Sequence, residues 1–155
     1  MDAATETTVY ERTMSIDASP ETVWEFFVDP EKLMSWKGID VKLDPRPGGV
    51  FYCEVIPGHK ARGEFVELDA PNRLVYTWGW EGNEGVPPGS STIEVELAPD
   101  GDGTSLRFLH HLQTVEAVAS HKAGWDHYLP RLELAATGKD PGPDEWVTNP
   151  PGPEM

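Results

Sequence analysis

The sequence predicts an α+β domain with a strongly curved antiparallel sheet of about seven strands, two short helices after the first strand and a long C-terminal helix packed across the sheet. Three observations favour this fold class. One strand-like segment is followed at once by two helix starts, six short runs between glycine and proline turns come next, and a long helical pattern closes the domain. A bent sheet covered by one helix commonly encloses an apolar cavity, which we expect here.

The first elements are one strand and two short helices. The segment TTVYERTMSI has the β-branched and aromatic content of a strand. In ASPETVWEFFVDPEKLMSW, Ser19 precedes Pro20 and Asp29 precedes Pro30. Each pair places an N-cap residue ahead of proline at the first helical position, where no backbone donor is needed. Two consecutive helix starts are therefore predicted.

Six strand-like runs follow, and turns rich in glycine and proline separate them. They are IDVKL, VFYCEV, ARGEFVEL, RLVYTWGW, STIEVEL and TSLRFLHH. In STIEVEL the apolar residues alternate with Glu94 and Glu96, so one face of the sheet is expected to meet water. Glu64 and Glu67 fit the same solvated face, which disfavours paired acid and base catalysis by these carboxylates.

The last predicted element is a long helix that starts near Thr114 and ends at Gly138, with apolar residues at helical spacing between them. Gly124 and Pro130 interrupt the pattern, so we expect either a kink or a later true start. At roughly 1.5 Å per residue, such a helix is long enough to cross a curved sheet.

We expect a single domain at residues 1–138 and a C-terminal tail at residues 139–155. The tail is rich in proline, glycine and acid, which is typical of extended chain, and Trp146 is the residue that would pin it to the domain. The single cysteine, Cys53, excludes an internal disulfide, and its place in VFYCEV predicts a buried thiol.

Composition argues against several classes of partner. The chain has 27 acidic and 12 basic residues and a formal charge of −15, which repels phosphate backbones and anionic lipid head groups. No apolar run approaches the roughly 18 residues of a membrane span, and the first residues are acidic where a secretory signal is basic. We expect a soluble, cytoplasmic protein without a nucleic-acid or membrane partner.

Five segments resemble the SRPBCC (START-like, helix-grip) superfamily, and within it proteins similar to the C-terminal domain of the activator of the ninety-kilodalton heat-shock chaperone's ATPase (AHSA-type). In chain order they are ASPETVWEFFVDPEKLMSW, DPRPGGVF, GEFVELDAPNRLVYTW, the T-x-L-x-F-x-H of Thr104 to His110, and HKAGWDHYLPRL. The resemblance runs from about Thr8 to Gly138.

This resemblance implies the helix-grip fold and, in many members, a hydrophobic ligand in the cavity. It does not imply one chemistry, because the superfamily includes lipid carriers, aromatase/cyclases, oxygenase domains and cochaperones. The eukaryotic activators that the sequence resembles also carry a separate N-terminal domain, which this sequence lacks. The resemblance to them therefore does not by itself imply a cochaperone.

Four of the five histidines fall in the segment SLRFLHHLQTVEAVASHKAGWDHYL. Alternation along the strand turns His110 inward and His111 outward. On the helix, His121 lies on the apolar stripe, while His127 lies roughly 120° away around the axis, toward the edge. We therefore expect an inner pair, His110 and His121, and an outer pair.

The inner pair predicts neither a metal site nor a cofactor. A zinc site needs three or four convergent ligands, and this segment offers two inward histidines without a placed carboxylate. No nucleophile signature such as G-x-S-x-G is present, and Asp126 and His127 point in different directions, so we assign no catalytic residue. Two interpretations of His110 and His121 stay open. They are either hydrogen-bonded histidines of the core or polar groups that contact a bound ligand.

The first hypothesis is a domain that binds a small hydrophobic or aromatic molecule, although core packing also explains each aromatic residue singly. Its predicted ligand-binding residues are Phe51, Tyr76, Trp78, Phe108, His110, His121 and Trp125. The second is an enzyme of the cyclase or hydrolase type with His110 or His121 as general acid or base. The third is a protein-interaction module that binds a chaperone or forms a homodimer through an open sheet edge.

Overall fold

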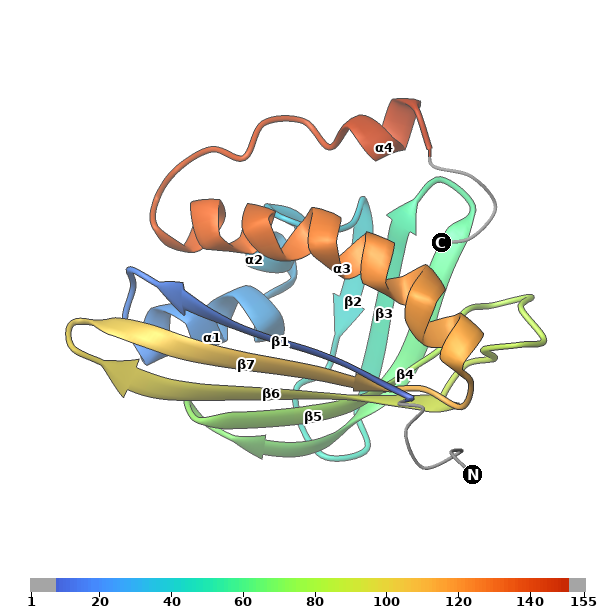
Figure 1. The fold of residues 1–155 in the computed structure, drawn as a ribbon, viewed down its shortest axis with the longest axis horizontal. Helices are drawn as coiled ribbons and strands as arrows, with labels where there is room; N and C mark the ends of the chain where they lie inside the picture. The colour runs from blue at the N-terminus through green and yellow to red at the C-terminus, as the bar shows by residue number, and fades with distance from the viewer. Residues whose placement is uncertain (1–7, 151–155) are drawn as a thin grey trace, which may run out of the picture.

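Seven antiparallel strands form one curved, unclosed sheet in the computed structural model, which describes residues 8–150 (Figure 1). The strand order is β1-β7-β6-β5-β4-β3-β2, so the first strand of the chain pairs with the last. The strands are β1 (Val9–Ile16), β2 (Asp40–Leu43), β3 (Val50–Ile56), β4 (His59–Asp69), β5 (Arg73–Trp78), β6 (Ser91–Asp100) and β7 (Gly103–His111). The predicted fold class is confirmed.

Two short helices follow β1, as the two proline-containing helix starts predict. They are α1 (Pro20–Val28) and α2 (Pro30–Met34). The Ser19 side chain caps α1 by accepting a hydrogen bond from the backbone N–H of Thr22. The Asp29 carboxylate caps α2 in the same way. Each proline occupies the first turn, where its missing N–H leaves no helical bond unmade.

The long helix α3 (Val115–Ala136) crosses the inner face of the sheet (Figure 1). It begins where the sequence predicts, because the Thr114 side chain accepts a hydrogen bond from the backbone N–H of Ala117. The helix is continuous through Gly124 and Pro130, so the later start that the sequence left open does not occur.

Cross-strand register places inward side chains from five strands in one row on the inner face of the sheet. Phe65 pairs with Tyr76, Tyr76 with Ile93, Ile93 with His110, and His110 with Tyr10. All five are buried. The row shows how residues from five strands reach one layer, because antiparallel partners on the same face lie about 5 Å apart.

The tail returns over the outer side of α3 and contains the short helix α4 (Glu145–Thr148) (Figure 1). Trp146 stacks on His127 with ring centres 3.9 Å apart and planes at 5°. The Asp144 carboxylate accepts hydrogen bonds from Nε2 of His127 at 2.8 Å and from the hydroxyl of Tyr128 at 2.6 Å. Trp146 thus contacts the domain as predicted, but its segment is a helical turn rather than extended chain.

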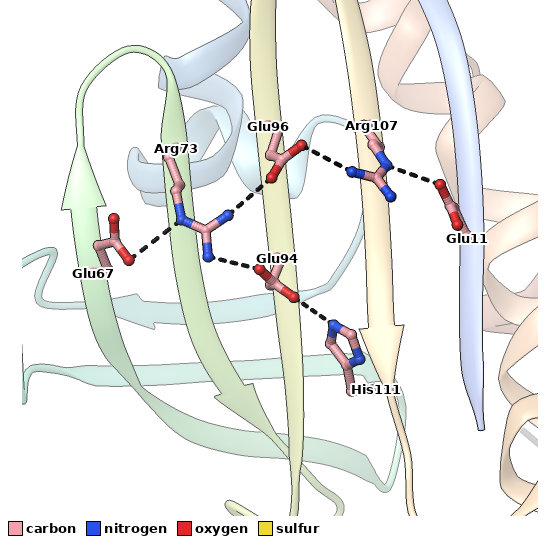
Figure 2. Close-up of polar contacts among 7 residues, drawn as sticks. All are labelled: Glu11, Glu67, Arg73, Glu94, Glu96, Arg107 and His111. Carbon is pink, nitrogen blue, oxygen red and sulfur yellow. Dashed lines mark hydrogen bonds and ion pairs between the residues drawn. The ribbon is translucent and has the colours of Figure 1, made fainter. Parts of the chain in front are cut away.

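The outer face of the sheet carries a network of ion pairs (Figure 2). Arg73 lies at its centre and contacts three carboxylates, those of Glu67, Glu94 and Glu96. The remaining contacts join Arg107 to Glu11 and Glu96, and His111 to Glu94. The hydrogen bond from Arg73 is the main reason why the pKa of Glu94 is lowered. Of the four glutamates predicted for a solvated face, Glu67, Glu94 and Glu96 therefore lie in this network, and Glu64 is exposed.

Candidate functional site

The structure brings all seven predicted ligand-binding residues into one buried cluster between the sheet and α3. Each is at most 4% exposed. The cluster is continuous, with ring centres 4.3 Å apart for Phe51 and Tyr76, 5.5 Å for Trp78 and Trp125, 4.5 Å for Phe108 and Trp125, and 5.0 Å for His110 and His121. Their proximity is therefore established, while their role in ligand binding stays a prediction.

A small hollow lies within this cluster, under the middle of α3. Its volume is about 20 Å³, and it is lined by Lys37, Val55, Trp78, Trp80, His121, Gly124, Trp125 and Tyr128. Such a volume holds about one water molecule, whereas ligand pockets typically have roughly 300–1,000 Å³. The hollow is therefore much smaller than the predicted cavity. Phe51, Tyr76 and Phe108, which the sequence predicts to line that cavity, pack against neighbouring rings and do not border the hollow.

His110 is held in one tautomer by its neighbours. The indole N–H of Trp125 donates a hydrogen bond to Nδ1 of His110 at 3.0 Å, and an indole has no acceptor to offer in return. Nδ1 is therefore unprotonated, so the ring proton lies on Nε2 and is donated to the hydroxyl of Ser91 at 2.9 Å. Ser91 in turn donates to the carbonyl of Trp78 at 2.7 Å.

His121 is held in the opposite tautomer. The indole N–H of Trp80 donates to Nε2 of His121 at 2.9 Å, which leaves the proton on Nδ1. Nδ1 donates to the carbonyl of Ala117, one turn earlier in α3, at 2.8 Å. Burial lowers the pKa of His121 and lowers that of His110 well below the usual histidine value, so both rings are neutral.

These bonds bear on catalysis by the inner histidines. Ser91 and His110 are within the distance of a Ser-His dyad, but the proton runs from His110 to Ser91, which is the wrong direction for activating a serine. All four ring nitrogens of His110 and His121 are engaged with protein groups. In this arrangement neither imidazole has a nitrogen free to exchange a proton with a substrate.

Lys37 is the interior residue that sequence reasoning missed. It lies between α2 and β2 and is 2% exposed. Its ammonium group has no hydrogen-bond partner among residues 8–150. Nζ lies 4.4 Å from the ring centre of Trp125 and 4.5 Å from that of Trp78, within the range of cation–π attraction. A single lysine after an apolar helix gives no spacing pattern that predicts burial.

A second donor at the hollow also has no partner. The indole N–H of Trp78 is buried and makes no hydrogen bond to any described residue. Trp78 and Lys37 both line the hollow. About nine in ten buried polar groups in folded proteins are hydrogen-bonded. Two buried donors without partners at the same hollow therefore mark the hollow as a candidate binding site.

The described residues form neither a cluster of metal ligands nor a membrane-spanning helix. Within residues 8–150, no three His, Cys, Asp or Glu side chains are grouped closely enough to hold a metal ion. No helix of that part of the chain has the length and apolar character needed to cross a bilayer.

The curved sheet gripped by one long helix, with aromatic side chains between them, defines a domain of the SRPBCC type. A family model described as activator of Hsp90 ATPase homolog 1-like protein matches residues 17–137. The chain therefore belongs to this AHSA1-like family, which confirms the resemblance seen in the sequence. No curated protein matches the chain.

Solved structures agree with the family assignment. An AHSA1-like protein from Rhizobium etli is 44% identical, with 88% of this chain and 86% of that chain covered and a TM-score of 0.70. CalU16 from Micromonospora echinospora is 28% identical, with 84% and 76% covered and a TM-score of 0.70. DynU16, described as a protein of the dynemicin biosynthetic locus, is 24% identical over 88% of this chain and 50% of its own, with a TM-score of 0.75, and shows the fold alone.

Proposed function

We propose that the protein binds a small, largely apolar or aromatic ligand between the sheet and α3. The observation that carries the proposal is a hollow with largely aromatic walls, two of whose lining residues carry buried donors, Nζ of Lys37 and Nε1 of Trp78, that have no partner within residues 8–150. A buried donor without an acceptor costs roughly 1–3 kcal/mol, and more when it is charged. A ligand with an acceptor atom removes this cost and replaces it with hydrogen bonds.

A ligand must enlarge the hollow, and α3 is the element whose displacement does so. His121, Trp125 and Tyr128 all come from this helix and form one wall. Moving α3 outward keeps every strand pairing intact, because the helix contributes none of the hydrogen bonds within the sheet. The movement lengthens the two bonds that tie α3 to the sheet, Trp80 to His121 and Trp125 to His110, so a ligand has to compensate for them. There is open space beside the hollow at Gly124. This residue borders the hollow, and a Cβ added there would meet no atom within 4 Å.

The test is a binding screen with a variant that fills this open space. Native mass spectrometry and calorimetry with a panel of apolar and aromatic molecules should detect at least one ligand for the wild-type protein. Gly124→Leu should weaken its binding at least tenfold, because the new side chain occupies the open space beside the hollow. Ala123→Leu places the same leucine side chain at an exposed position of α3 and should bind as the wild type does.

Two results would contradict the proposal. One is a wild-type protein that binds no member of the panel. The other is a ligand whose affinity is equally affected in both leucine variants, because that would place it outside the hollow.

The structure gives less support to the other two hypotheses. The cyclase or hydrolase hypothesis requires a free imidazole nitrogen, and those of His110 and His121 are engaged. For an interaction module, the outer sheet face offers side chains that already pair with one another (Figure 2). Ligand binding is therefore the function that the geometry favours.

A further inference from the structure

The backbone around Lys37 is held firmly, so the position of its side chain is set by the fold. The Lys37 N–H donates to the carbonyl of Leu33 at 2.9 Å, and Arg131 of α3 donates to the carbonyl of Trp36 at 3.1 Å. Gly38 follows with φ at +104°, and a Cβ there would lie 2.7 Å from Sγ of Cys53. Glycine at position 38 thus permits the tight turn that precedes β2.

The ammonium group of Lys37 lies in a cage of four aromatic rings. Besides Trp78 and Trp125, the ring centres of Trp36 and Phe51 lie 5.4 Å and 6.0 Å from Nζ. Ring faces attract a cation but accept no conventional hydrogen bond, so the three N–H groups still lack acceptors. Among the described residues no carboxylate forms an ion pair with Lys37.

Burial lowers the pKa of Lys37 to about 8. The neighbouring thiol of Cys53 does not supply a counter-charge, because burial raises its pKa to about 11. At neutral pH the interior therefore holds a lysine that is mostly protonated and has no anion beside it in the described part of the chain. An unpaired buried cation is a strong local attraction for an anion that reaches it.

The indole N–H of Trp78 limits which kind of anion fits beside Lys37. Nε1 of Trp78 and Nζ of Lys37 belong to residues that line the same hollow, and neither has an acceptor among the residues that the structure describes. A carboxylate has two oxygens and accepts from both donors at once, whereas an alcohol or an amide satisfies them without neutralising the charge. The rest of the lining is largely aromatic and apolar, which suits a hydrocarbon or aromatic body.

We propose that the ligand is a small aromatic or apolar carboxylic acid, bound as its anion, whose carboxylate accepts hydrogen bonds from Nζ of Lys37 and Nε1 of Trp78. This inference rests on the proposed ligand-binding function and names the chemical class of the ligand. Nζ of Lys37 and Nε1 of Trp78 are better anchors than the inner histidines, because the histidine nitrogens already have protein partners in the structure. The inner histidines instead hold Trp80 and Trp125 in place as two of the walls.

The experiment compares phenylacetate with phenylacetamide, which has the same shape and no charge. Calorimetry at pH 7 should show the acid binding wild-type protein at least tenfold more tightly than the amide. Lys37→Met should abolish this preference by weakening the acid, while Trp78→Phe should weaken the acid less. The control Lys42→Met removes an exposed lysine of β2 and should leave both affinities unchanged.

The pH dependence gives an independent readout. Between pH 7 and pH 9 the acid should lose about tenfold in affinity, because a lysine with a pKa near 8 loses most of its protonated form over this range. The other titratable groups facing Lys37 stay neutral there: the pKa of Cys53 and Tyr128 is raised by burial, and that of His110 and His121 is lowered. The amide should show no such loss.

The outcomes separate this inference from the function on which it rests. If phenylacetamide binds as tightly as phenylacetate, or if Lys37→Met keeps the preference for the acid, the carboxylate inference is overturned and a neutral-ligand site remains. If neither probe nor any member of the wider panel binds, the proposed function itself fails.

Discussion

The indole N–H of Trp125 points at Nδ1 of His110, and Trp80 makes the equivalent bond to Nε2 of His121. These two contacts predict opposite tautomers for two neighbouring neutral histidines. Long-range ¹H–¹⁵N NMR at pH 7 should show the proton on Nε2 of His110 and on Nδ1 of His121. Finding both rings in the same tautomer, or either ring protonated on both nitrogens, would contradict the hydrogen-bond assignment.

Stability should fall as the pH drops below the usual histidine range. In the unfolded chain His110 and His121 take up protons near pH 6.5, whereas burial lowers the pKa of both in the folded state, that of His110 further. The unfolded state then binds more protons, so the free energy of unfolding falls by up to about 1.4 kcal/mol per pH unit for each histidine below pH 6.5. Urea unfolding at pH 7, 6 and 5 measures this slope. His110→Gln should have a shallower slope, and an unchanged slope would count against a neutral His110.

Removing the ammonium of Lys37 should stabilise the protein. Lys37→Met keeps an unbranched apolar stem and removes an unpaired buried charge, so we expect a gain of about 1–3 kcal/mol in the free energy of unfolding at pH 7. The control Lys42→Met changes an exposed lysine and should stay within about 0.5 kcal/mol of the wild type. Chemical denaturation provides the measurement.

The stability gained by Lys37→Met should also depend on pH in a definite direction. The pKa of Lys37 is lowered from 10.5 to about 8 by folding, so between these values the unfolded state binds more protons and wild-type stability rises with pH. The advantage of Lys37→Met should therefore shrink between pH 8 and pH 10.5. A loss of stability in the variant at pH 7 would show that Lys37 has a partner that the structure does not contain.

The fold was largely predictable because its signals are local. Ser19 followed by Pro20 and Asp29 followed by Pro30 set two helix starts, and the N-cap residue Thr114 sets the third. Strand alternation predicted the inward histidine of β7, and helical spacing predicted that of α3. These patterns depend on backbone geometry that each short segment determines for itself.

The size of the hollow and the burial of Lys37 were not predictable in this way. Alternation tells which face of a strand is buried, but not whether Phe51 and Tyr76 stack on one another or line an open cavity. Lys37 is buried because α3 places Trp125 over it from about 90 residues further along the chain. No pattern in the residues next to Lys37 reports that distant contact.

The tail should be held to α3 mainly through Asp144. Asp144→Ala removes the acceptor for His127 and Tyr128 and leaves both donors without that partner, so the free energy of unfolding should fall by about 1–2 kcal/mol. Proteolysis between residues 138 and 150 should become faster at the same time. Asp140→Ala is the control, since its carboxylate bonds only to the N–H of Gly142 within the tail. Equal effects of the two substitutions would contradict the role of Asp144.

A carboxylate in the hollow is detected most simply by the indole N–H signal of Trp78 in a ¹H–¹⁵N NMR titration with phenylacetate. A carboxylate bound in the hollow accepts from this N–H, so the signal should move strongly downfield, while that of Trp146 on the far side of α3 stays in place. In Lys37→Met the shift should appear only at much higher phenylacetate concentration. A Trp78 signal that does not move at saturating phenylacetate would contradict the central claim that Lys37 and Trp78 form the polar end of a ligand site.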